Sequence, residues 1–305
     1  MDILVACPAN CATGGPECLH EFASNLNKIV NARIWYWNAE GDPVPDEYSK
    51  YNCEYVITMP DDFDGILIVP EIYASKLTWF TCRKAIYWLG VDAYATWTPP
   101  RDYGAFLDDD ILHIVQSEYA YDFLSKLGVK RIVYCTDALN EDFYEPYKEE
   151  PRSDTVLYNP AKATSFMGEL IKASGVEYKP IQNMTRAEVI DSMRHAKLYV
   201  DFGEFPGRER MPREAALCGC CLITSKIGSA AFYKDFAHDY KYDSKPGHIW
   251  AITHKIHYVL EHYDECKKDF DFFRQTLRKD RETRSEQCEN VVRALYDIQH
   301  YNTGT

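Results

Sequence analysis

One stretch of the sequence concentrates charge in a way that points to anion binding. Residues 205–214 read FPGRERMPRE and hold three arginines and two glutamates. A Pro-Gly turn opens this stretch and an apolar run follows it, which is typical of a loop that leads into a helix. Guanidinium groups bind diphosphates through paired hydrogen bonds, and the N–H groups that open a helix add partial positive charge. We therefore expect Arg208, Arg210 and Arg213 to form an anion site.

The glutamates of the same stretch allow a second interpretation. Glu214 falls in the first turn of the expected helix, where its carboxylate could accept hydrogen bonds from a ribose diol. Alternatively, Glu214 only caps the helix, and the arginines pair with Glu204 and Glu209 on the surface.

Two further segments combine a strand end with phosphate-binding residue types. Asn159 and Lys162 follow the apolar run TVLY and precede a helical pattern, although a single lysine there is more often solvated. Gly14 and Gly15 lie in ATGGPE, where glycine lets a backbone approach a ligand closely. The segment fits neither GxGxxG nor a P-loop, which disfavours nucleotide hydrolysis, and a tight turn is its alternative role.

Carboxylates after other apolar runs are candidates for catalysis. Asp92 follows KAIYWLGV and could act as a base on an acceptor hydroxyl or stabilise an oxocarbenium-like sugar, the alternative being a turn cap. Glu17 and His20 follow the Gly-Gly pair, and Glu71 ends the run ILIVP. Each of these three could contact a ligand, but His20 lies at helical spacing from Glu17 and could equally be structural.

The elements that must position these residues form two α/β halves. In the first half, a strand, a Gly-rich loop, a helix and a second strand open a parallel sheet. Its expected strands are 2–7, 32–37, 65–70, 84–91, 113–117 and 130–135. Residues 141–154 hold six acids and two prolines without hydrophobic periodicity, so we interpret them as a linker.

After this segment the α/β pattern restarts. Strands are expected at 155–160, 176–181, 198–203 and 221–225, and Thr185 with Glu188 predicts a capping box. From about residue 249 the pattern is helical. We expect domains at 1–145 and 146–280, with a helix at 281–305 that packs back on the first domain, mediates dimerisation or contacts a membrane. Loops after parallel strands carry the binding sites of such sheets.

Charge and composition exclude several classes of partner. The 305-residue chain has a net charge of −13 and a pI near 5.2, which argues against broad binding to nucleic acid or anionic lipid. The eleven cysteines show no CxxC spacing, and we interpret them as reduced core residues with no metal site. The acidic runs LDDDIL and MPDDFDG are interpreted as solvated. Without a secretory leader or an apolar span, a cytoplasmic protein is expected, with weak peripheral membrane contact as the remaining alternative.

Several segments together resemble a known enzyme family. TGGPECLHEF, IYWLGVDAY, HIVQSEYAYDFLSKLG, YNPAKATSFMGELI and DFGEFPGRERMPREAALCGCCLITSKIGSAAFY occur in this order. They resemble bacterial-type glycosyltransferases of the GT-B fold, and distantly the family 4 retaining enzymes, over roughly residues 1–240. PREAALCGC carries most of the specificity. The resemblance implies two Rossmann-like domains facing across a cleft and a UDP- or GDP-sugar donor.

The resemblance also implies roles for individual residues. Asn159, Lys162 and either Arg208 or Arg210 would hold the diphosphate, Glu214 the ribose, and Gly14 with Gly15 a phosphate. No catalytic metal is implied, since cations and helix termini neutralise the leaving group.

The sequence departs from the family pattern at one position. The retaining family usually has two glutamates separated by seven residues, but Pro206 stands where the first would be. Glu209 or Glu204 could take the sugar-contacting role, and retention remains favoured over inversion. We predict a glycosyltransferase that moves a sugar from a nucleotide donor to a glycan or glycoconjugate hydroxyl. A sugar-nucleotide epimerase and a non-catalytic nucleotide-sugar-binding protein remain alternatives.

Overall fold

The chain forms two compact α/β units. The computed structural model describes residues 2–91 and 107–301. Unit 1 contains Met1–Ala138 together with Glu282–Thr305, and unit 2 contains Leu139–Arg281. Unit 2 is therefore inserted, along the chain, between two segments of unit 1.

The sheet of unit 1 is parallel throughout, in the order β3-β2-β1-β4-β5-β6-β7. Ile3 lies opposite both Ala32 of β2 and Ile66 of β4. The central strands are continuous apolar runs because both of their faces are buried. The bounds are β1 (Asp2–Cys7), β2 (Asn31–Tyr36), β3 (Tyr55–Val56), β4 (Ile66–Pro70), β5 (Arg83–Trp88), β6 (Leu112–Val115) and β7 (Ile132–Tyr134).

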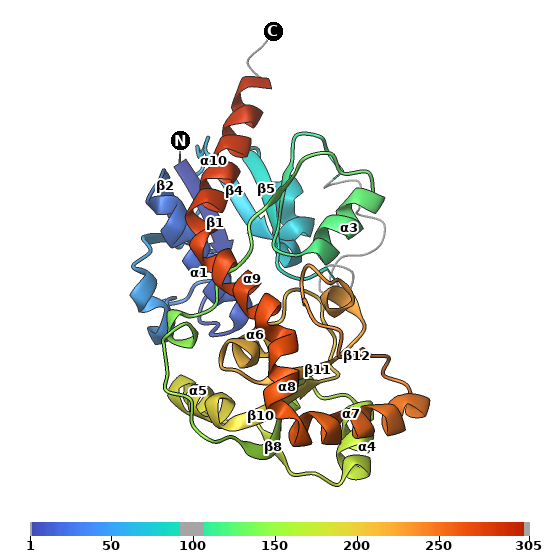
Figure 1. Ribbon diagram of the computed structural model, residues 1–305. Coiled ribbons are helices and arrows are strands. Elements are labelled where there is room, and N and C mark those ends of the chain that lie inside the picture. Colours follow the sequence, from blue (N-terminus) through green and yellow to red (C-terminus); the bar gives the residue numbers. More distant parts are fainter. Residues whose placement is uncertain (1, 92–106, 302–305) are drawn as a thin grey trace. The chain divides into compact units, whose positions relative to one another are not determined.

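Helices cover both faces of this sheet. α1 (Gly14–Asn27) and α10 (Arg284–Tyr301) pack on one face, and α3 (Glu118–Lys126) packs on the other (Figure 1). Ser117 caps α3 by accepting a hydrogen bond from the Ala120 N–H at 3.1 Å. Gly128 follows the end of the helix, and its φ of 85° lies in the left-handed region that glycine favours.

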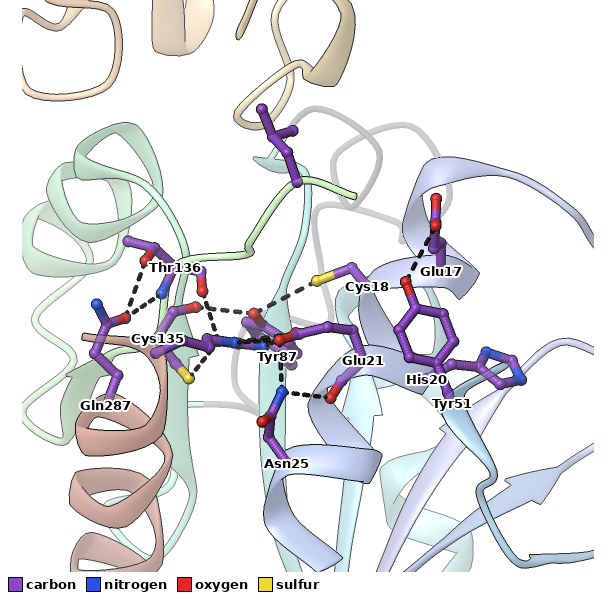
Figure 2. Close-up of polar contacts among 12 residues, drawn as sticks. Glu17, Cys18, His20, Glu21, Asn25, Tyr51, Tyr87, Cys135, Thr136 and Gln287 are labelled. Carbon is purple, nitrogen blue, oxygen red and sulfur yellow. Dashed lines mark hydrogen bonds and ion pairs between the residues drawn. The ribbon is translucent and has the colours of Figure 1, made fainter. Parts of the chain in front are cut away.

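A polar cluster joins α10 to the body of unit 1. Arg284 is 4% exposed and forms an ion pair with Glu21 of α1. It also donates to the Cys135 Sγ at 2.7 Å and to the Thr136 carbonyl. The Gln287 Oε1 accepts from the Thr136 N–H at 2.7 Å, as Figure 2 shows. The C-terminal helix is thus held by buried charge as well as by apolar packing.

Unit 2 contains a second parallel sheet, in the order β12-β11-β10-β8-β9. Its strands are β8 (Ser153–Tyr158), β9 (Tyr178–Pro180), β10 (Ala196–Asp201), β11 (Cys221–Ser225) and β12 (Lys241–Tyr242). The helices are α4 (Ser165–Ser174), α5 (Arg186–His195), α6 (Arg210–Leu217), α7 (Ile249–Glu261), α8 (Tyr263–Cys266) and α9 (Asp271–Glu282). The predicted capping box of Thr185 and Glu188 opens α5 and is confirmed.

Two local predictions are wrong. Residues 141–154 are not a free linker, because Phe143 and Tyr144 are buried in the core of unit 2. Arg152 donates to the Ala196 carbonyl at 2.7 Å. Polar contacts therefore also hold this segment to unit 2, although its sequence shows no hydrophobic periodicity. Gly14 and Gly15 do not form a loop before the helix but open α1 itself, where the proline that follows is tolerated in the first turn.

None of the helices formed by the described residues is long and apolar enough to cross a membrane.

Candidate functional site

The charged stretch follows β10, at the carboxyl edge of the sheet of unit 2. β10 ends at Asp201 and α6 begins at Arg210, so residues 202–209 form the loop between them. β8 runs parallel to β10 as its neighbour, so the residues after Tyr158 emerge at the same edge. The predicted loop position is confirmed, although α6 already includes Arg210 and Arg213.

Lys162 and Glu209 meet at this edge. The Lys162 Nζ forms an ion pair with the Glu209 Oε2, although 47 residues separate the two in sequence. The Lys162 side chain is 43% exposed, whereas that of Glu209 is 14% exposed. Asn159 begins the short turn that carries Lys162, and its Oδ1 accepts from the Ala161 N–H at 3.0 Å. Asn159 thereby shapes the turn that presents the lysine.

Arg210 and Glu214 lie one turn apart on α6. The Arg210 Nε is 3.6 Å from the Glu214 Oε1, and both side chains are largely buried. Glu209 is the N-cap residue, but its side chain makes no capping hydrogen bond. The N terminus of α6 therefore adds partial positive charge beside Arg210.

The other two arginines of the stretch are buried. The Arg208 side chain is 2% exposed and its Nη2 lies 2.7 Å from the Asp280 Oδ2 of α9. The Arg213 Nε donates to the Glu209 carbonyl at 3.0 Å, and its Nη2 donates to the Arg208 carbonyl. The Arg213 guanidinium therefore fixes the backbone of the loop, whereas that of Arg208 ties the loop to α9. Arg210 is the most accessible of the three arginines, at 16% exposed.

Asp201 belongs to the same cluster, and our sequence analysis did not select it. Its carboxyl accepts from the Gly203 N–H at 2.9 Å and from the Tyr199 hydroxyl at 3.2 Å. Burial raises the pKa of Asp201 to about 6, the Gly203 N–H lowers it, and the nearby Glu209 carboxylate raises it further. Its position at the end of an apolar run was the signal that could have identified it.

Glycine permits the close approach of the two loops. A Cβ added at Gly203 would lie 2.9 Å from the Lys162 carbonyl oxygen and 3.0 Å from the Asp201 Oδ1. The loop is also tied to the segment after β11, because the Phe205 carbonyl accepts from the Ser229 N–H at 2.8 Å. Lys162 and Glu209 are therefore held together by backbone contacts as well as by charge.

The Gly203→Ala variant tests this close approach. We expect it to unfold with a free energy lower by about 1–3 kcal/mol, because the added methyl group must displace the turn that carries Lys162. Gly168→Ala is the matched control, since Gly168 lies within α4 with nothing within 4 Å of the added Cβ. Alanine there should stabilise by about 0.5–1 kcal/mol. Equal changes in the two variants, measured by urea unfolding, would contradict the role of Gly203.

Two of the candidate residues of unit 1, Gly15 and Glu17, lie in the first turn of α1. Gly15 contacts the end of β5, since an added Cβ would lie 3.7 Å from the Leu89 Cδ1. The Glu17 Oε1 accepts from the Tyr51 hydroxyl at 3.1 Å (Figure 2). It also lies 3.2 Å from the Lys50 Nζ. Glu17 therefore joins α1 to the segment after β2. Asp92 lies outside the described residues.

His20 is a satisfied core residue. It is 1% exposed, its Nδ1 is 2.7 Å from the Pro16 carbonyl oxygen, and its Nε2 is 2.7 Å from the Tyr36 hydroxyl. The carbonyl can only accept, so Nδ1 carries the proton and Nε2 accepts from the tyrosine. Burial lowers the pKa of His20, which keeps the ring neutral. These contacts support the structural role for His20.

Glu71 is 3% exposed and lies directly after β4, as predicted from the sequence. Its Oε2 accepts from the Leu89 N–H at 2.8 Å. Burial raises the pKa of Glu71 to about 7, although the N–H groups of Leu89 and Gly90 act in the opposite direction. Glu71 thus holds the end of β5, the strand that leads towards Asp92.

The raised pKa of Glu71 predicts a pH dependence of stability. The folded protein keeps this proton up to about pH 7, whereas the unfolded chain releases it near 4.5. The contribution of protonated Glu71 to the free energy of unfolding is therefore fully present below pH 4.5. It is lost as the pH rises through 7, by about 3 kcal/mol. Urea unfolding at pH 4.5 and 8 should show a smaller loss in Glu71→Gln than in the wild type by this amount, the remaining loss coming from groups such as Asp201. The exposed Glu54→Gln control should behave like the wild type, and an identical pH profile for Glu71→Gln would refute the assignment.

The acidic runs of unit 1 are solvated, as the sequence predicts, and the hollow in unit 2 lies away from Lys162. Asp61, Asp62 and the residues 108–110 are exposed. A hollow of about 410 Å³ opens at the amino ends of β8 and β10, lined by Arg152, Lys197 and five acidic residues. It lies at the opposite edge of the sheet from Lys162. Within 2–91 and 107–301, no group of three or more His, Cys, Asp or Glu side chains is arranged to hold a metal ion.

Comparison with known proteins identifies the fold. No family model matches the sequence. No curated protein is similar to it at a significant level. Among solved structures, the chain is similar to a glycosyltransferase from Rickettsia africae ESF-5, with a TM-score of 0.68 and 13% identity over 98% of both chains. It is also similar to HepE from Anabaena in complex with UDP-glucose, with a TM-score of 0.64 and 13% identity over 100% of both chains.

A third similar structure is sucrose-phosphate synthase from Thermosynechococcus elongatus, with a TM-score of 0.68 and 12% identity over 97% of this chain and 99% of that one. The two parallel α/β sheets with their helices are thus those of GT-B glycosyltransferases, and the predicted fold is confirmed. The finer likeness to family 4 stays a prediction.

Proposed function

We propose that this protein transfers a sugar from a nucleoside-diphosphate donor to a hydroxyl of a glycan or glycoconjugate. The observation that carries the proposal is the convergence of Lys162, Arg210 and the N terminus of α6 at one sheet edge. Solved proteins of the same fold support it, since HepE was solved with UDP-glucose and with UDP and glucose. The donor is accordingly expected to be a UDP- or GDP-sugar.

In this proposal the cationic groups neutralise the departing diphosphate. Lys162 and Arg210 would contact phosphate oxygens, and Glu214 would accept from the ribose hydroxyls. Fixed positive charge near developing negative charge lowers the barrier without a catalytic metal ion. Gly14 and Gly15 would let a phosphate approach the N terminus of α1. Asp92 is the proposed acid-base or stabilising carboxylate, and transfer with retention is proposed from the family resemblance.

A thermal-shift panel tests the donor site directly. We expect UDP or GDP and their sugar conjugates to raise the melting temperature in proportion to the logarithm of concentration, as binding linkage requires. ADP and CMP serve as comparison ligands. If no nucleotide shifts the melting temperature, the proposed function is wrong. Product analysis with donor alone then separates a transferase from an epimerase, because an epimerase converts the donor without an acceptor.

A further inference from the structure

Three of the candidate phosphate-binding cations are paired with carboxylates of unit 2. Lys162 is paired with Glu209, Arg210 with Glu214, and Arg208 with Asp280. An anion that enters this edge therefore meets cations that already have partners. Because opposite charges at these distances attract, a ligand competes with a carboxylate for each of these cations.

The pair of Lys162 and Glu209 is the one most readily exchanged. The Lys162 side chain is 43% exposed, whereas Arg208 is 2% and Arg210 16% exposed. Solvent reaches the lysine end of this pair, so it can separate at lower energetic cost than the two arginine pairs. The Glu209 backbone meanwhile stays in place, because its carbonyl is held by the Arg213 Nε at 3.0 Å. The carboxylate can therefore rotate away while α6 keeps its position.

A second acidic group strengthens the tendency of Glu209 to leave. Asp201 lies close enough to Glu209 for their charges to interact, and it is 6% exposed. An incoming phosphate would add a third negative group beside the single ammonium of Lys162. Like charges repel at this range, so the phosphate and Glu209 cannot both remain on Lys162 at full strength.

We propose that Glu209 competes with the donor for Lys162. The Glu209 carboxylate occupies the position that a donor phosphate would take beside the lysine, and donor binding displaces it. This inference rests on the proposed function, since it names the regulation of the same site. Removing the charge of Glu209 should therefore tighten the binding of anions, whereas removing a residue that contacts the ligand would weaken it.

The Glu209→Gln variant separates these roles. Calorimetric titrations in 0.1 M salt would compare UDP, GDP and inorganic pyrophosphate between the wild type and Glu209→Gln. We expect the nucleoside diphosphate that binds the wild type to bind the variant about three- to tenfold more tightly. Glu169→Gln is the matched control, because Glu169 is exposed on α4 and its replacement changes the net charge equally. It should leave the dissociation constants within twofold of wild type.

The outcomes distinguish this inference from the proposed function. Unchanged or weaker binding by Glu209→Gln, with the wild type binding a nucleotide, overturns the competition and leaves the proposed function intact. An equal gain in Glu169→Gln also overturns it, since general electrostatics would then explain the effect. If only pyrophosphate binds, and more tightly to Glu209→Gln, the competition stands and the nucleotide-sugar function fails. If none of the three anions binds either protein, both are wrong.

Discussion

The Lys162→Met variant should bind a nucleoside diphosphate about 100-fold more weakly than the wild type. A hydrogen bond between charged groups contributes about 1.5–3 kcal/mol, which corresponds to roughly 10- to 150-fold in affinity. The loss falls at the upper part of this range, because Glu209 would then face the ligand without its cation. The free energy of unfolding should fall by about 1 kcal/mol, because Glu209 is 14% exposed but water screens the pair at the 43% exposed Lys162.

Two further variants make this result specific to Lys162. Lys172→Met removes an exposed lysine from the last turn of α4 and should leave the affinity within twofold of wild type. In Lys162→Met combined with Glu209→Gln, part of the lost affinity should return. The measurement is titration calorimetry at constant ionic strength, because phosphate binding is sensitive to salt. A loss of less than threefold in Lys162→Met would mean that the lysine does not contact the diphosphate.

The Arg284→Met variant should unfold with a free energy lower by about 3–5 kcal/mol. Arg284 is 4% exposed, and its removal leaves the Glu21 carboxylate, 14% exposed, without its cation. Breaking one side of a buried ion pair is costly for this reason. The Cys135 Sγ and the Thr136 carbonyl would lose a donor as well. Urea unfolding followed by tryptophan fluorescence reports the change, because Trp35 and Trp88 are buried in unit 1.

A control on the same helix separates burial from charge. Arg293 pairs with Glu289 four residues earlier on α10, but its side chain is 71% exposed. Arg293→Met should therefore change the unfolding free energy by less than about 0.5 kcal/mol. The double variant Glu21→Gln with Arg284→Met should be less destabilised than the sum of its single variants. Additive losses would show that the two side chains do not act as a pair.

Most of the fold could be predicted because short segments of the sequence determine where its strands and helices lie. Continuous apolar runs separated by Gly and Pro identified most of the strands, and Thr185 with Glu188 identified the start of α5. The two-residue strands β3 and β12 were missed, since so short a segment has no period to detect. The loop after β10 was placed at the correct edge for the same local reasons.

The partners within the site could not be predicted, because they depend on contacts between distant residues. Nothing in the sequence around Lys162 indicates that Glu209 neutralises it, or that Arg208 is buried against Asp280. The raised pKa of Asp201 likewise arises from burial between neighbouring strands. Residue types and spacing therefore identified candidate cations, while the fold decided which of them are accessible.

The division of unit 1 into two segments has a consequence for synthesis on the ribosome. Unit 2 is complete once Arg281 has emerged, whereas unit 1 still lacks α10 and the cation that neutralises Glu21. Domains generally fold as units, the N-terminal one first. Here we expect the reverse order, because the N-terminal segment of unit 1 needs α10, which is translated after unit 2. Limited proteolysis of stalled nascent chains from which Arg281 has just emerged should therefore digest residues 2–138 while 139–281 resist.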